Sequence, residues 1–254
     1  MAITIKSERE IELMAEAGKI LERVHNELEK ALHPGMSTKD IDTLGEKIIR
    51  SYGCIPSFLN YNGYPASICV SVNQEVVHGI PDKHRIIHEG DIVSLDAGVI
   101  YKGYHSDAAR THAVGEVSEE AKKLIQVTKE CFFEGIKYAK AGNHLFDISG
   151  AIGRYAEERG YGVVRDLCGH GIGTALHEDP QIPNYAQKRR GVRLQAGMTL
   201  AIEPMINIGT YEVDWLDDDW TVVTRDGSLS AHYENTILIT EGEPRILSLT
   251  CDNE

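Results

Sequence analysis

A weak internal repeat constrains the fold of this chain more than any other feature of its sequence. At an offset of 107 residues, glycine, aspartate and isoleucine positions coincide, so that Gly35, Asp40, Ile41 and Gly53 match Gly142, Asp147, Ile148 and Gly160. Residues 89–96 likewise match residues 196–203, and Asp96 falls on Glu203. The repeat therefore predicts two similar halves, at about 7–115 and 116–245, within a single domain of residues 1–254.

Hydrophobic periodicity predicts that each half contains two helices followed by strands. Ser7 and Glu10 have the spacing of a capping box that starts a helix, and Pro34-Gly35 should end that helix. The expected helices are 7–32, one beginning near 37, 118–140 and 146–158, and the expected strands are 67–72, 91–100, 107–114, 199–208, 220–224 and 230–240. The predicted fold class is α+β, with paired helices packed on a mostly antiparallel sheet.

Composition restricts the class of protein further. With 42% apolar and 26% charged residues, the chain has the make-up of a soluble globular protein. No uncharged apolar run reaches the roughly 18 residues of a membrane helix, and the first residues lack the layout of a signal peptide. A net charge of −13 argues against nucleic-acid binding as the main function. The scattered cysteines indicate a reducing cytoplasm, with most of them small buried residues: Cys54, Cys69, Cys131, Cys168 and Cys251.

Two aspartates stand in consecutive strand-like segments. Asp96 follows the apolar run Ile92-Val-Ser-Leu95, where an unpaired carboxylate is costly to desolvate. A turn centred between residues 101 and 102 would set Asp96 opposite Asp107, and a bulge would move the pairing by a residue or two. Facing carboxylates repel unless they share a proton or a cation. The alternative is that one of the two faces solvent or caps a turn.

The second half supplies two glutamates in similar surroundings. Glu203 follows the apolar segment Leu200-Ala-Ile202 and precedes Pro204, which should end its strand. Asp226-Gly227 predicts a hairpin between the strands at 220–224 and 230–240. That hairpin would bring Glu234 near Trp220, although Glu234 taken alone could equally face solvent on an alternating strand.

Three histidines beside glycine or proline are candidates for the same site. His170 lies between two glycines, where the backbone can bend and leave the imidazole open. His177 and His78 lie in the segments 176–180 and 76–81, each of which ends in proline. One histidine is more often a surface or core residue than a ligand, but these three accompany four strand carboxylates. His84 and His88 lack the glutamate of an HExxH motif, so we expect them at the surface.

Several segments together resemble those of type I methionine aminopeptidases over nearly the whole chain. They are 60–65 (NYNGYP), 77–81 (VHGIP), 94–98 (SLDAG), 105–107 (HSD), 169–173 (GHGIG), 201–205 (AIEPM), 219–220 (DW) and 233–235 (YEN). The combination is far more specific than any single segment. It implies the pseudo-twofold "pita-bread" fold, in agreement with the internal repeat.

The resemblance also implies a site for two metal ions. Asp96 would bind one ion, His170 and Glu203 the other, and Asp107 and Glu234 would bridge them. Four carboxylates and one imidazole suit divalent Mn, Fe, Co or Zn rather than Cu(I). Two ions about 3.5–4 Å apart lower the pKa of a shared water, and we expect the resulting hydroxide to attack the first peptide bond. One ion would also hold the free α-amine, which restricts cleavage to the N-terminus.

Catalytic roles follow from the same resemblance. Glu203 is the expected proton shuttle, His177 the group that stabilises the oxyanion, and His78 the group that positions the scissile amide. We expect nascent polypeptide N-termini as substrates of a cytoplasmic monomer, with no membrane and no direct nucleic-acid partner. A contact with the ribosome is left open.

A methionine pocket needs apolar walls with polarisable groups. Tyr61, Tyr64, Cys69 and Trp220 match the pocket positions of the family, and contacts between sulfur and aromatic rings favour a thioether. The alternative for the two tyrosines is ordinary packing at the edge of the sheet. Leu176 stands where many relatives have an aromatic residue, so the shape of the pocket is open at this position.

Three other functions agree less well with the sequence. Proline-specific aminopeptidases and creatinase-like enzymes share the fold but usually carry an extra N-terminal domain, whereas here the pattern begins almost at once. The 33 residues from His170 to Glu203 leave no room for the large insertion of type II enzymes. A non-catalytic binding protein should have lost ligands, and a phosphoesterase needs a cluster of Arg or Lys near its motifs. We therefore expect an enzyme that releases N-terminal methionine from chains with a small second residue.

Overall fold

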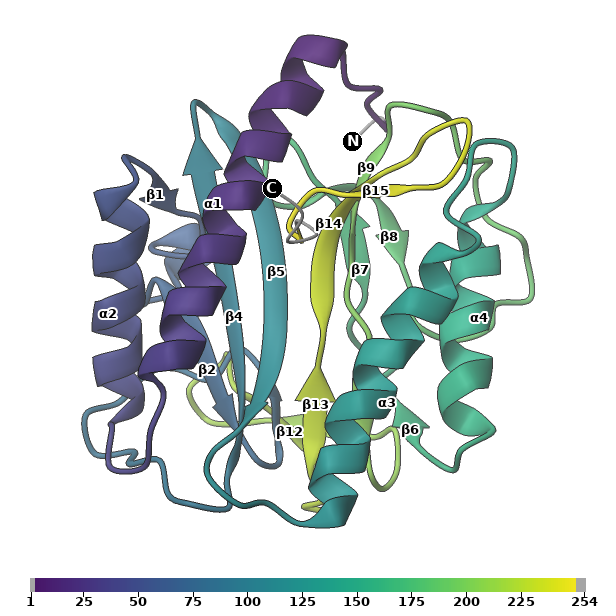
Figure 1. The fold of residues 1–254 in the computed structure, drawn as a ribbon. Coiled ribbons are helices and arrows are strands. Elements are labelled where there is room, and N and C mark those ends of the chain that lie inside the picture. Colours follow the sequence, from purple (N-terminus) through teal and green to yellow (C-terminus); the bar gives the residue numbers. More distant parts are fainter. Residues whose placement is uncertain (1–2, 250–254) are drawn as a thin grey trace.

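The structure, a computed structural model, describes residues 3–249 and places helices on one face of a central antiparallel sheet (Figure 1). The α-helices of this part of the chain are α1 (Glu8–Ala31), α2 (Thr38–Ser51), α3 (Glu119–Ile136) and α4 (Leu145–Glu157). Helix α1 begins at the predicted capping box, in which the Ser7 hydroxyl accepts the Glu10 N–H and the Glu10 carboxylate accepts the Ser7 N–H. Helix α3 ends at Ile136 rather than near Lys140.

The central sheet joins the two halves of the repeat. Its strands run in the order β1-β4-β5-β14-β9-β7-β8, with β2 beside β4 and β15 beside β14, and all are paired antiparallel. The bounds are β1 (Ile55–Pro56), β2 (Ile68–Val72), β4 (Ile92–Tyr101), β5 (Tyr104–Ala113), β7 (Gly169–Gly171), β8 (Glu178–Ile182), β9 (Thr199–Ile202), β14 (Glu234–Leu238) and β15 (Arg245–Ile246). Because β5 and β14 meet at the centre, β4 and β9 occupy equivalent flanking places. The predicted α+β, pseudo-twofold architecture is confirmed.

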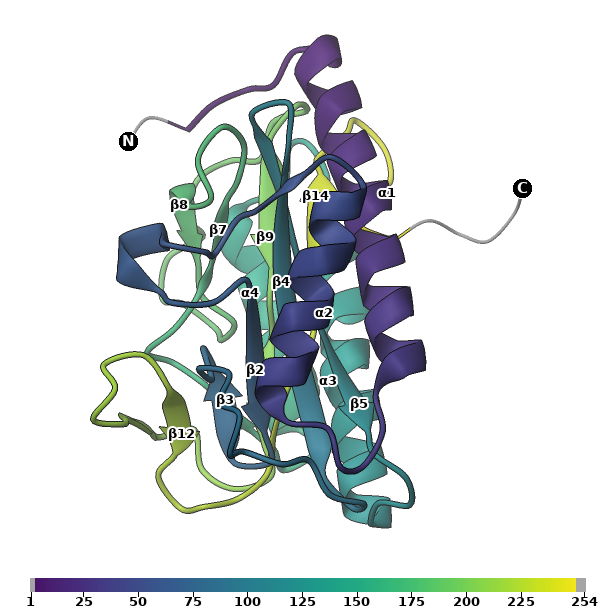
Figure 2. The same cartoon turned by 90° about the vertical axis from the view of Figure 1, so that its left-hand side faces the viewer.

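The helices cover one side of this sheet, and the small sheet that contains β12 (Val222–Thr224) lies on the other. Helices α1 and α2 pack against the strands of the first half and α3 and α4 against those of the second, each pair over its own apolar core. Figure 2 shows α1 on one side, with β12 and β8 on the other. The smaller sheets are β13 (Ser230–His232) with β10 (Met205–Asn207) and β6 (Gly162–Val163), and β11 (Val213–Trp215) with β12 (Val222–Thr224) and β3 (Glu75–Val77).

The register of the β4–β5 hairpin differs from the expected one. Tyr101 pairs with Tyr104, so the turn is centred between Lys102 and Gly103 and Asp96 faces Ala109 instead of Asp107. Both turn residues have positive φ, 49° and 88°, as the two-residue hairpin turn that matches strand twist requires. Since the shift amounts to two positions, Asp107 stays on the same face of the sheet as Asp96.

The hairpin expected around Asp226-Gly227 does not form. Strand β12 pairs with β11 and β3, whereas β13 pairs with β10. The Asp226 carboxylate accepts the N–H groups of Thr210 and Ser228, which binds this turn to the neighbouring 207–210 segment. The expected strand 199–208 is also split at Pro204 into β9 and β10, which join different sheets, because proline has no N–H for the ladder.

Side-chain burial agrees with the expectations for the cysteines and the two surface histidines. Cys54, Cys69 and Cys131 are buried free thiols and Cys168 is half-buried, while Cys251 lies outside the described residues. His84 and His88 are exposed. Among residues 3–249, no helix combines the length and apolar character needed to cross a membrane.

Candidate metal centre and adjoining pocket

All the predicted site residues line one cavity of about 170 Å³. Compared with about 30 Å³ for a water molecule in the liquid, this volume accommodates a group of several heavy atoms. Fourteen residues form its wall: Phe58, Tyr61, Asn62, Tyr64, Cys69, His78, Asp96, Asp107, His170, Leu176, His177, Glu203, Trp220 and Glu234.

Strand register explains how three of the carboxylates converge. Ala109 of β5 is paired with Asp96 of β4 on one side and with Glu234 of β14 on the other. Asp107, two residues before Ala109, points to the same face as these two partners because side chains alternate along a strand. The three acids therefore come from three adjacent strands at the middle of the sheet. Glu234 reaches the site through β14–β5 pairing, not through the hairpin that the sequence suggested.

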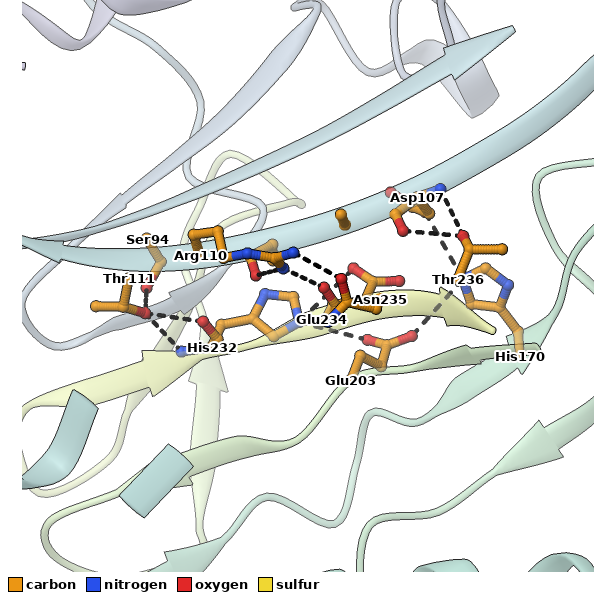
Figure 3. A network of polar contacts seen from close by, with 12 residues as sticks. Ser94, Asp107, Arg110, Thr111, His170, Glu203, His232, Glu234, Asn235 and Thr236 are labelled. Carbon is orange, nitrogen blue, oxygen red and sulfur yellow. Dashed lines mark hydrogen bonds and ion pairs between the residues drawn. The ribbon is translucent and has the colours of Figure 1, made fainter. Parts of the chain in front are cut away.

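The two remaining ligand candidates come from the other flank of the sheet. His170 of β7 pairs with Ala201 of β9, and Glu203 lies two residues beyond Ala201, just after the end of β9. The His170 Nε2 atom lies 3.6 Å from a Glu203 oxygen and 3.8 Å from an Asp107 oxygen. Figure 3 shows His170, Glu203, Asp107 and Glu234 gathered between the strands. Ligand atoms of Asp107, His170 and Glu234 lie within 4.8 Å of one another.

A backbone contact orients the His170 imidazole toward the acids. Its Nδ1 atom is 2.9 Å from the Gly171 carbonyl oxygen, which can only accept. We therefore assign the proton to Nδ1, which leaves the Nε2 lone pair directed at Asp107 and Glu203. A ring nitrogen held by a carbonyl in this way is typical of metal-binding histidines.

Burial shifts the pKa of every ionisable group in the cluster. It raises the pKa of Asp96, Glu203 and Glu234 well above the usual carboxyl range, and repulsion from Asp107 adds to the rise. The pKa of Asp107 is raised to about 7 by burial, although bonds to Ala108 N–H and to Asp96 oppose the shift. Burial, with a contribution from nearby His177, lowers the pKa of His170 to about 3, so its imidazole is neutral near pH 7.

The chemistry of this donor set fits divalent metal ions. Buried oxygens of Asp96, Asp107 and Glu234 have no hydrogen-bond partner among residues 3–249. An unpartnered buried carboxylate oxygen is costly, and adjacent carboxylates repel. A cation relieves both costs at once, and oxygen donors with one neutral imidazole suit Mn, Fe, Co or Zn.

An apolar pocket adjoins the acids. The Tyr64 and Trp220 rings meet edge to face at 5.1 Å, and Cys69, which pairs with Asp96 across β2 and β4, lines the same cavity. Leu176 is 2% exposed and closes part of the wall. The structure therefore brings the four predicted pocket residues together with Leu176.

His177 and His78 lie at the edge of the cavity, between the pocket and the acids. His177 Nδ1 is 2.7 Å from the Tyr61 hydroxyl, and its ring lies 4.2 Å from that of His170, centroid to centroid. The His78 ring faces Trp220 at 6.2 Å. Burial lowers the pKa of His177 and lowers that of His78 to about 4, so both are neutral near pH 7.

Several residues around the acids were not anticipated from the sequence. Arg110 on β5 is half-buried next to Glu234, where it donates to the Glu234 carbonyl and to the Asn235 side chain, at 2.6 Å for the latter (Figure 3). His232 Nε2 lies 3.9 Å from oxygens of both Glu203 and Glu234. Phe58 and Asn62 complete the cavity wall. Of these residues, only His232 could have been identified from the sequence. It lies two residues before Glu234, and side chains two apart share a face of an extended chain.

Comparison with known proteins supports the class of protein that this geometry indicates. The profile of metallopeptidase family M24 matches residues 12–241, which is most of the chain. The chain therefore belongs to metallopeptidase family M24. The fold of a methionine aminopeptidase from Thermotoga maritima superposes with a TM-score of 0.96 at 47% identity, over 98% of this chain and 100% of that one.

Sequence relatives define the branch within the family. A methionine aminopeptidase of Clostridium acetobutylicum is 59% identical over 97% of this chain and 99% of its own length. Methionine aminopeptidase 1 of Bacillus subtilis is 51% identical over 94% of this chain and 96% of its own. These relatives place the chain among the type I methionine aminopeptidases of the bacterial type, as the sequence motifs suggested.

Proposed function

We propose that this protein removes the N-terminal methionine from nascent proteins and peptides whose second residue is small. The observation that carries the proposal is the convergence of four carboxylates and a neutral histidine beside an aromatic, sulfur-containing pocket. The acids suit a metal-dependent hydrolase, and the pocket suits a thioether side chain. The full-length similarity to methionine aminopeptidases supports the same activity.

We assign the metal ligands as follows. Asp96 would hold one ion, His170 and Glu203 the other, and Asp107 and Glu234 both. The proximity of Asp107, His170 and Glu234 supports this assignment. When bound, two divalent ions would supply Lewis acidity that makes water a nucleophile near neutral pH. Mn, Fe, Co and Zn are all compatible with the donors.

The remaining residues of the site would handle protons and orient the substrate. Glu203 would take the proton of the attacking water and deliver it to the leaving amine, because its carboxylate lines the cavity next to His170. His177 would donate to the oxygen that becomes negative, with its ring held by the Tyr61 hydroxyl. His78, whose ring lies 6.2 Å from that of Trp220 in the cavity wall, would position the scissile amide.

The pocket would bind the methionine side chain between Tyr61, Tyr64, Cys69 and Trp220. Tyr64 is held rigidly because its hydroxyl donates to the Gly79 carbonyl at 2.9 Å. Leu176 supplies an aliphatic wall at the position where the sequence left the pocket shape open.

The setting of the enzyme is proposed on the same basis. Residues 1–254 would act as one catalytic domain made of the two repeats, about 7–115 and 116–245. We expect it to work as a monomer in the cytoplasm on emerging chain termini, with no membrane or direct nucleic-acid partner.

The test is a peptide panel assayed after chelation and reloading with Mn, Fe or Co. We expect methionine release from Met-Ala and Met-Gly peptides, little release from peptides with a bulky second residue, and none without metal. The Asp107→Asn variant serves as the inactive control.

The alternative is an Xaa-Pro aminopeptidase of the same family. An Xaa-Pro dipeptidase from Bacillus anthracis superposes with a TM-score of 0.77 at 26% identity, with this chain matching 98% of itself but only 63% of that protein. The similarity is therefore weaker and partial. Efficient cleavage of Xaa-Pro peptides, or full activity of Asp107→Asn, would refute the methionine-specific assignment.

A further inference from the structure

A short segment before α1 crosses from the helix side of the molecule to the side that carries the site. We call residues 3–6 the N-terminal strap. Figure 2 shows it leaving the top of α1 and passing above β8. The Lys6 N–H donates to the Gly197 carbonyl at 2.8 Å, and Ile3 packs against the core of the second half. The strap is thus fixed at both of its ends.

A buried ion pair joins this strap to the residue that follows His177. Lys6 Nζ lies 2.6 Å from Glu178 Oε2, with side chains only 4% and 9% exposed. The Thr4 hydroxyl donates to the same oxygen at 2.8 Å. Burial would raise the pKa of Glu178, but the bonds from Lys6 and Thr4 outweigh it and keep that pKa below its usual value. The Glu178 carboxylate is therefore ionised and held on two sides.

The same carboxylate also holds the loop 172–177, which joins β7 to β8. Glu178 Oε1 accepts the Ala175 N–H at 3.3 Å, and the Gly173 carbonyl accepts the His105 N–H of β5 at 2.8 Å. Gly173 leaves room for the pair, because a Cβ there would lie 2.5 Å from Lys6 Cε and 2.4 Å from Glu178 Oε1. Lys6 thus packs directly on the loop.

This loop presents two groups to the active-site cavity. Leu176 forms part of the pocket wall, and His177 reaches the Tyr61 hydroxyl and the His170 ring. Glu178 directly follows His177, so the contacts that hold the Glu178 carboxylate against the strap also fix the backbone next to His177. The strap does not line the cavity itself.

We propose that Lys6 and Glu178 are positioning residues for the reaction, whose buried ion pair fastens the N-terminal strap to the loop 172–177 and thereby sets His177 and Leu176 in place. The expected effect on turnover rests on the proposed function, whereas the expected effect on the loop does not. Burying a carboxylate without its partner costs free energy, so the side chain moves to where water can solvate it. Loss of Lys6 would therefore displace Glu178 and the loop with it.

The test compares Lys6→Met, Glu178→Gln and the double variant with wild type. Hydrogen exchange of residues 172–178 reports on the loop, calorimetry with Mn on metal affinity, and Met-Ala peptide hydrolysis on turnover. In Lys6→Met we expect faster exchange of the loop and a fall in kcat on the order of tenfold or more, as small misplacements of catalytic groups produce. KM should change less than kcat, and metal affinity should stay within about twofold, because four of the five ligands lie on the sheet and Glu203 directly follows β9.

Two comparisons separate positioning from general stabilisation. Lys19→Met removes an exposed pair with Glu16 on α1, at 50% and 51% exposure, and should leave both loop exchange and kcat unchanged. The double variant leaves no unpaired buried charge, so it should recover part of the protection from hydrogen exchange that the loop loses in Lys6→Met. Glu178→Gln keeps the shape of the side chain and provides the measurement if Lys6→Met does not fold.

The outcomes distinguish the two proposals. Unchanged loop exchange and unchanged kcat in both single variants, with only a lower melting temperature, would overturn the positioning role. A wild-type protein that releases no methionine would refute the proposed function, while the exchange data would still decide whether the ion pair holds the loop.

Discussion

At the scale of single residues, the site is a set of buried charges that the folded chain cannot satisfy by itself. Asp96, Asp107 and Glu234 are buried and the Glu203 side chain is 14% exposed, and burial raises the pKa of all four. Arg110 lies close enough to lower the pKa of Glu234 in part, but it bonds to the carbonyl of Glu234 and not to its carboxylate. In the absence of metal, these carboxyl groups therefore retain protons that a bound cation would displace.

Replacement of Asp107 by asparagine tests this competition directly. Asp107→Asn removes one of the repelling carboxylates, so the metal-free variant should be more stable than metal-free wild type above pH 7. It should also lose most of its metal affinity and turnover, because Asp107 is the proposed bridge. Urea unfolding in chelator and calorimetric titration with Mn measure the two effects. A metal-free variant less stable than wild type at pH 8 would contradict the account of repulsion.

Arg110→Met tests the support behind Glu234. The guanidinium holds the Glu234 carbonyl and the Asn235 amide oxygen, so its loss should loosen the end of β14 and weaken Mn binding by about 10- to 100-fold. Arg225→Met is a suitable control, since Arg225 pairs with Asp214 at the surface. Equal Mn affinity in both variants would show that Arg110 does not influence the ligands.

At the scale of elements, the β4–β5 hairpin sets the relation between the first two acids. Its turn at Lys102 and Gly103 makes Asp96 a partner of Ala109, and Glu234 of β14 is paired with the same alanine. One turn thus controls the register on which three of the carboxylates depend.

Gly103→Val should destabilise this hairpin. Gly103 has φ of 88°, where a side chain is strained, so we expect a loss of roughly 1–2 kcal/mol in the free energy of unfolding. Gly242→Ala is the matched control, since that glycine lacks positive φ and a Cβ there meets nothing within 4 Å. Urea denaturation of both variants measures the difference, and equal midpoints would show that the turn does not depend on glycine.

At the scale of the whole molecule, the acids link stability to pH and to metal. A group whose pKa is raised by folding stabilises the protein below its ordinary pKa, and that contribution is lost as pH rises through the folded value, about 7 for Asp107. The buried histidines contribute to the pH dependence of stability with the opposite sign, since folding lowers the pKa of His170 to about 3 and that of His78 to about 4. Their contribution changes only below about pH 6.5, where unfolded histidine titrates.

The window from pH 6.5 to 8 therefore isolates the carboxylates. The metal-free protein should lose stability as pH rises through this range, by up to about 1.4 kcal/mol per pH unit for each proton released. Saturating Mn should raise the melting temperature and flatten this dependence, because it binds the deprotonated ligands of the folded state. Thermal unfolding with chelator and with Mn at three pH values is the measurement. Stability of the metal-free protein that rises with pH would contradict the prediction.

Local chemistry was sufficient to predict much of this protein from its sequence. The capping box at Ser7, the four helices and the equivalence of Asp96 and Glu203 depend on neighbouring residues or on a repeated pattern, and the fold class follows from them. All the proposed ligands and pocket residues, identified from motifs, meet in one cavity.

Only the tertiary structure decided how those residues meet. Local turn signals misplaced the β4–β5 register by two positions and predicted a hairpin at Asp226 that does not form, since strand pairing depends on distant partners. The repeat also could not show why His170 has no mirror ligand: Ser71 occupies the equivalent place, because it pairs with Ser94 as His170 pairs with Ala201. The Lys6–Glu178 pair spans 172 residues, and no local pattern predicts which distant charge will offset the cost of burying the Glu178 carboxylate.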